Sequence, residues 1–187
     1  YVFDEVLKIR DSLKSTPNCE DKEIINTIYE SYIKYKKNKN LLSKDMILIG
    51  HENFEFRKIN NKNKKRYLIY RYKFNIYPKI KKTSNYPPCV QIEPTSICNY
   101  RCIMCYQADK SFSNKSNGFM GHMSFETFQK CIDELEGNVE AITFASRGEP
   151  TLNKDFFKML SYSKNKFLAL KLNTNASMLN QDSIHAN

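Results

Sequence analysis

From residue 89 on, strand-like and helix-like patterns alternate along the chain, and this alternation limits the possible folds more than any other feature. Short apolar runs at 89–94, 139–146 and 167–175 predict three strands. Between them, 124–137 and 154–164 repeat apolar residues at helical spacing and predict two helices. Such repeats form parallel sheets with right-handed crossovers, and their functional loops follow the carboxyl ends of the strands. We therefore expect an α/β fold.

The first part of the chain has another pattern. Apolar residues at helical spacing within 2–13 and 24–33 predict a helical pair. From Asn53 the period changes to two, which predicts a β-hairpin over 53–76. This first part is therefore expected to be a small α+β region.

The net charge of +10 comes from the same part of the chain. Residues 1–88 hold 20 Lys and Arg against 10 Asp and Glu, whereas residues 89–187 hold 10 of each. We expect a basic domain in 1–86 and a second domain in 87–187, joined near two prolines. The basic excess is either a solvated surface or a surface that binds nucleic acid or an acidic partner.

Three of the six cysteines, Cys98, Cys102 and Cys105, stand within eight residues after the first predicted strand. No apolar run approaches the roughly 20 residues that cross a bilayer, and no signal-peptide pattern is present, so a cytoplasmic protein without a membrane span is expected. In the cytosol, clustered cysteines are more often metal ligands than disulfides. Their spacing allows one loop to bind three corners of an iron–sulfur cube, which leaves one iron without a protein ligand.

Two simpler interpretations of the cysteines stay open. A structural zinc requires four ligands, and Cys89 is the only nearby fourth thiol. Positions i, i+4 and i+7 also share one face of a helix and could pack inward, although Pro94 favours a loop. A non-catalytic metal-binding module whose basic half binds nucleic acid is therefore an alternative to an enzyme.

The segment CNYRCIMCY, with CxxxCxxC spacing, resembles the cluster loop of the radical S-adenosylmethionine (radical SAM) superfamily. Two further motifs follow in the family's order. RGEPTL after the second predicted strand resembles the GGEP motif, and NTNA at the end of the third resembles the TNG motif. Arg147 replaces the first Gly of GGEP, and Ala176 replaces the Gly of TNG. The resemblance covers about residues 88–187.

The resemblance implies a [4Fe–4S] cluster whose free iron is chelated by the amino and carboxylate groups of S-adenosylmethionine. Reduction of the cluster by one electron, from a donor such as flavodoxin or ferredoxin, leads to a 5′-deoxyadenosyl radical that abstracts a hydrogen atom from the substrate. Met104 is placed against the adenine, and Gly148 and Glu149 at the methionyl end. The residues implied at the two cofactors are Cys98, Cys102 and Cys105 for the cluster, and Met104, Gly148, Glu149 and Asn175 for S-adenosylmethionine.

The resemblance also implies the architecture and the class of substrate. The family's barrel usually has six strand–helix units, so we expect a TIM-type (β/α) barrel truncated after its third strand, in a piece of a longer enzyme. The motif wording is similar to the branch with an auxiliary-cluster (SPASM-type) domain, which often modifies peptides or proteins. A peptide or protein substrate is therefore expected. An RNA-modifying radical SAM enzyme, with RNA on the basic half, is the alternative.

Overall fold

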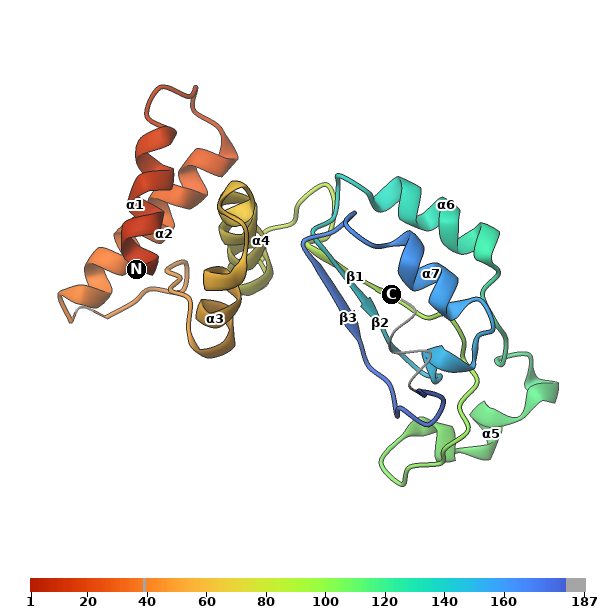
Figure 1. The fold of residues 1–187 in the computed structure, drawn as a ribbon. Helices are drawn as coiled ribbons and strands as arrows, with labels where there is room; N and C mark the ends of the chain where they lie inside the picture. Colours follow the sequence, from red (N-terminus) through yellow and green to blue (C-terminus); the bar gives the residue numbers. More distant parts are fainter. Residues whose placement is uncertain (39, 181–187) are drawn as a thin grey trace. The chain divides into compact units, whose positions relative to one another are not determined.

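The computed structural model describes residues 1–38 and 40–180, which divide along the chain into two compact units, with the boundary between Pro88 and Cys89 (Figure 1). The elements described in the first unit are all helices, and the second unit combines a parallel sheet with helices. No helix within the described ranges has the length and apolar character needed to span a membrane.

The first unit contains four α-helices and one short 3₁₀ helix in its described residues. They are α1 (Val2–Ser12), α2 (Glu20–Lys36), α3 (Gly50–Lys58), η1 (Asn61–Asn63) and α4 (Lys64–Ile76). The helices α1 and α2 lie where helical spacing predicts two helices. They pack against each other, and Val6, Ile25 and Ile28 are fully buried.

The β-hairpin expected over 53–76 is wrong, because α3 and α4 occupy this stretch. The apolar residues there satisfy a period of two, but Leu68, Tyr72 and Ile76 also recur at every fourth position and are all buried. Phe74, which a strand would place on the same face as Tyr72, is 44% exposed. The helix α4 contacts α2, and this packing buries the face of α4 that carries these three residues. Tertiary packing therefore overrode the preference for a strand that the alternating pattern indicates.

The second unit contains the predicted parallel sheet. Its strands are β1 (Cys89–Ile92), β2 (Ala141–Phe144) and β3 (Ala169–Leu172), arranged in the order β1-β2-β3. Both pairs are parallel, and Ile92, Phe144 and Leu172 stand side by side at the carboxyl edge. This confirms an α/β unit that is consistent with part of a (β/α) barrel.

Two helices cover one face of this sheet. The helix α6 (Phe125–Leu135) connects β1 to β2, and α7 (Phe156–Tyr162) connects β2 to β3, so both crossovers lie on the same side (Figure 1). Ser124 caps α6 by accepting a hydrogen bond from the N–H of Thr127. The core between the helices and the sheet consists of Ile92, Phe128, Ile132, Val139, Ile142, Phe144, Phe156 and Met159.

A long connecting segment separates β1 from α6. It contains the cysteine loop and three short helical turns, η2 (Tyr106–Ala108), α5 (Lys110–Ser113) and η3 (Lys115–Asn117). A further turn, η4 (Pro150–Leu152), follows β2. All four turns lie after the carboxyl ends of their strands, where the sequence places its unusual motifs.

Candidate functional site

Three loops meet at the carboxyl edge of the sheet, and each carries one of the predicted motifs. The cysteine loop, here residues 95–105, follows β1; the Arg147–Glu149 loop follows β2; and Asn173–Asn175 follows β3. The parallel register brings the three strand ends together, so the fold gathers motifs that are up to 77 residues apart in the sequence.

The cysteine loop presents three free thiols of different exposure. Cys98 and Cys105 are half-buried, whereas Cys102 is exposed. The sulfur of Cys98 accepts hydrogen bonds from the N–H of Tyr100 (3.4 Å) and from the side-chain amide of Asn175 (3.8 Å). The sulfur of Cys105 accepts one from the N–H of Gln107 (3.5 Å). N–H groups therefore contact the sulfur atoms of both half-buried cysteines.

The loop conformation removes one alternative and weakens another. No helix includes residues 98–105, so the interpretation of the three cysteines as an inward-facing helical stripe is wrong. Cys89 begins β1 and therefore lies at the opposite end of the strand from the loop, with its sulfur 3.9 Å from Oγ1 of Thr143. It is poorly placed as a fourth zinc ligand.

Gly148 allows the second loop to approach the first. A Cβ atom at this position would lie 1.9 Å from the carbonyl oxygen of Thr95 and 2.8 Å from that of Ile97. The next residue continues the contact, because the N–H of Glu149 donates to the carbonyl of Ile97 across 2.9 Å. Only glycine fits a backbone approach of this closeness.

The carboxylate of Glu149 is buried, with 3% of the residue exposed. Its Oε1 accepts hydrogen bonds from the hydroxyls of Thr151 (2.6 Å) and Thr174 (2.5 Å), and its Oε2 accepts one from the N–H of Asn175 (2.6 Å). Burial by itself raises the pKa of Glu149, but these hydrogen bonds outweigh it and the pKa is lowered. An ionised carboxylate therefore ties the loop after β2 to the loop after β3.

Asn175 completes the connection between the three loops. Its backbone bonds Glu149, and its side-chain amide donates to Oδ1 of Asn99 (3.0 Å) as well as to the sulfur of Cys98. The structure therefore brings Cys98, Glu149 and Asn175 together. Met104 and Cys102 remain outside this network, and Met104 is 86% exposed.

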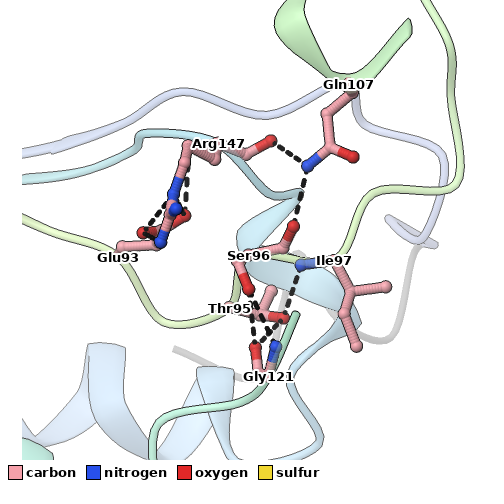
Figure 2. A network of polar contacts seen from close by, with 7 residues as sticks. All are labelled: Glu93, Thr95, Ser96, Ile97, Gln107, Gly121 and Arg147. Atoms are coloured by element: carbon pink, nitrogen blue, oxygen red, sulfur yellow. Dashed lines mark hydrogen bonds and ion pairs between the residues drawn. The ribbon is translucent and has the colours of Figure 1, made fainter. Parts of the chain in front are cut away.

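Sequence reasoning missed a second network, shown in Figure 2, that joins segments following β1 to the loop after β2. The guanidinium of Arg147 forms an ion pair with Glu93, with three N···O distances of 3.0 to 3.1 Å, and this contact raises the pKa of Arg147. The buried side chain of Gln107 bonds the carbonyls of Ser96 and Arg147. In the sequence Arg147 stands out only as a departure from GGEP, and no pattern marks Gln107.

The donors of the cysteine loop fit an iron–sulfur cluster. Three thiols lie on one loop, and two of them accept hydrogen bonds from N–H groups, which are among the features that set the potential of such a cluster. In the part of the chain that the structure describes, no group of three or more His, Cys, Asp or Glu side chains is arranged to hold a single metal ion. A four-iron cluster instead offers a separate iron corner to each thiolate.

Comparison with known proteins identifies relatives of the second unit. The family model described as the Radical SAM superfamily matches residues 92–186. An Fe-coproporphyrin III synthase from Methanosarcina barkeri is 27% identical over 95 residues, which cover 51% of this chain and 23% of that protein. A tungsten-containing aldehyde ferredoxin oxidoreductase cofactor-modifying protein from Pyrococcus furiosus is 31% identical over 93 residues, which cover 49% and 24%.

A third relative, the mycofactocin maturase MftC from Mycobacterium ulcerans, is 29% identical over 96 residues, which cover 51% of this chain and 24% of the maturase. The chain thus spans only 23% to 24% of the length of these curated relatives. No solved structure matches the chain significantly.

Proposed function

The chain belongs to the radical SAM superfamily, and we propose that it is a radical SAM enzyme whose two cofactors bind at the carboxyl edge of β1, β2 and β3. Members of this superfamily use a [4Fe–4S] cluster and S-adenosylmethionine. The observation that supports this location most directly is Asn175, which contacts both Glu149 and the sulfur of Cys98. One residue thereby links all three motifs.

In this proposal the thiolates of Cys98, Cys102 and Cys105 hold three corners of the cluster. When bound, the cluster and S-adenosylmethionine supply one-electron reduction and the abstraction of a hydrogen atom from the substrate. The half-buried Cys98 and Cys105 accept hydrogen bonds from N–H donors, whereas Cys102 is exposed. Met104 offers an exposed apolar side chain beside the thiols, which suits contact with an adenine ring.

We further propose that Gly148 and Glu149 meet the methionyl end of S-adenosylmethionine, with Asn175 beside them. Because the Glu149 carboxylate is buried and already accepts hydrogen bonds, its main task is to hold the loop whose backbone faces the cofactor. The close approach at Gly148 places that backbone directly against the cysteine loop. The chain's own contribution is thus to fix the position of one cofactor relative to the other.

The substrate is proposed to be a peptide or protein, and the chain to belong to the SPASM-type branch of the superfamily. The support is that the segments CNYRCIMCY, GFMGHMSFETF and GEPTL resemble that branch. The three relatives are named as a synthase, a cofactor-modifying protein and a maturase. We propose a flavodoxin or ferredoxin as electron donor, the cytoplasm as location, and a barrel completed by further strands. RNA as substrate rests on the basic excess of residues 1–88 alone.

Anaerobic purification of the full native protein tests the proposal. We expect a brown protein that contains iron and sulfide and that, once reduced, cleaves S-adenosylmethionine to 5′-deoxyadenosine and methionine. The changes Cys98→Ala, Cys102→Ala and Cys105→Ala should each abolish the cluster. The control Cys131→Ala removes a thiol on α6 and should leave the iron content unchanged. A colourless protein that holds one zinc ion would contradict the proposal.

A further inference from the structure

Gln107 forms hydrogen bonds both to the start of the cysteine loop and to the loop after β2. It lies in η2, two residues after Cys105, and is 1% exposed. Its Nε2 donates to the carbonyl of Ser96 and to the carbonyl of Arg147, both across 2.7 Å. One side chain therefore joins the start of the cysteine loop, its end, and the residue that precedes Gly148 (Figure 2).

The two carbonyls determine which chemical group this position needs. Both are acceptors, so a group between them must donate two hydrogen bonds in different directions, as a primary amide does. The reverse orientation of the amide would set Oε1 against two carbonyl oxygens, so the two partners fix the orientation of the amide. A buried thioether or alkyl group would leave both carbonyls without this donor.

The second end of the amide supports the same interpretation. Oε1 of Gln107 is buried and has no hydrogen-bond partner among the described residues. An unsatisfied buried acceptor lowers stability, so this position would be more stable with an apolar side chain if filling space were its only task. The two donors of Nε2 are the feature that an apolar side chain could not replace.

We propose that Gln107 is a positioning residue, which fixes the thiolate of Cys105 relative to Cys98 and to the Gly148–Glu149 loop. This inference rests on the proposed role of the three cysteines as cluster ligands. The backbone N–H of Gln107 bonds the sulfur of Cys105 while its side chain holds the carbonyl of Ser96, two residues before Cys98. Movement of Gln107 would therefore change the separation of the first and third thiolates.

Gln107→Met tests this inference, because methionine keeps the volume and length of the side chain and removes both donors. The full native protein is purified anaerobically with its cluster. The rate of iron loss to a chelator is then measured, together with the electron paramagnetic resonance spectrum of the reduced cluster with and without S-adenosylmethionine. We expect iron loss about thirtyfold faster than in wild type, the factor for two ordinary hydrogen bonds, together with a broadened spectrum.

Asn153→Leu is the matched control. Asn153 is also buried, and its Nδ2 also bridges two carbonyls, those of Pro94 (2.7 Å) and Met123 (2.9 Å). Its Oδ1 accepts a further bond from the N–H of Asp155, so this change removes three hydrogen bonds. It has no bond to the cysteine loop among the described contacts. We expect lower thermal stability than wild type, with iron loss within about twofold of the wild-type rate.

The outcomes separate the inference from the proposed function. Wild-type protein without an iron–sulfur cluster would contradict the proposed function itself. A clustered wild type with equal iron loss in Gln107→Met and Asn153→Leu, or with no change in Gln107→Met, would overturn the positioning role alone. If Gln107→Met does not fold, the test uses Gln107→Asn, which keeps both donors on a side chain one methylene shorter. A wild-type rate of iron loss and a wild-type spectrum in that variant would overturn the positioning role.

Discussion

The backbone N–H of Asn175 lies 2.6 Å from Oε2 of Glu149, so a carboxylate in the loop after β2 holds the chain that follows β3. The same carboxylate accepts the hydroxyl hydrogens of Thr151 and Thr174 through its other oxygen. Because Asn175 also contacts Cys98, the charge on Glu149 indirectly positions the cysteine loop. This relationship assigns Glu149 a structural task that is distinct from binding iron.

Glu149→Ala is expected to lower the free energy of unfolding by about 1.5–3 kcal/mol, the range for hydrogen bonds to a charged group, when measured by urea denaturation without cofactors. The cluster should still form, since Glu149 does not contact a thiol. Affinity for S-adenosylmethionine should fall roughly ten- to a hundredfold, because the loop at Gly148 is released.

The control for this change is Glu134→Ala on the exposed side of α6, which should alter stability by less than about 0.5 kcal/mol. If Glu149→Ala retains both wild-type stability and wild-type affinity, the buried carboxylate does not hold the loops.

Gly148→Ala is expected to disrupt the contact between the first two loops, because the new Cβ would lie 1.9 Å from the carbonyl oxygen of Thr95. Backbone on both sides must shift, and we expect a loss of about 1–3 kcal/mol in stability or more. Gly121→Ala is the matched control, since nothing lies within 4 Å of a Cβ there. Equal effects in the two variants, measured by denaturant unfolding, would contradict this close approach.

Ala176→Gly is expected to stabilise the protein. Ala176 has a left-handed backbone with φ of 61°, which an L-residue adopts at a cost of about 1–2 kcal/mol. After the greater chain entropy of unfolded glycine is subtracted, a gain of about 0.5–1 kcal/mol in the free energy of unfolding should remain. Ala169→Gly in β3 is the control and should instead destabilise by roughly 0.5–1 kcal/mol. A loss of stability in Ala176→Gly would show that this turn is not strained.

The stability of the first unit should depend on acid through Glu20. Hydrogen bonds from Lys82, Lys73 and Tyr77 lower the pKa of Glu20 from 4.5 to about 2. Because the folded pKa lies below the unfolded one, this stabilisation is complete above pH 4.5 and is lost as the pH falls toward 2. Glu20→Gln should therefore lower stability near neutral pH and reduce its further loss in acid. Parallel pH profiles of the free energy of unfolding for the two proteins would contradict this.

The strands and the two longer helices of the second unit follow from the sequence alone, as do the positions of its motifs. Strand-length apolar runs and amphipathic helices alternate there. The period and the length of each apolar run therefore predict the same kind of element. The spacing of Cys98, Cys102 and Cys105 likewise indicated a metal-binding loop without any structural information. In residues 53–76, by contrast, tyrosines and aliphatic residues satisfy both a period of two and helical spacing, and only the contact with α2 decided for helices.

Tertiary structure alone decided how the loops are joined. Gln107 bonds a carbonyl 40 residues away, and Arg147 pairs with Glu93 across 54 residues. Carbonyl groups are present on every residue, so no sequence pattern indicates which of them a buried amide will bond. The GEP motif draws attention to Glu149 in the sequence, but the partners of its carboxylate follow from the parallel register of β2 and β3, which places Thr174 and Asn175 beside it.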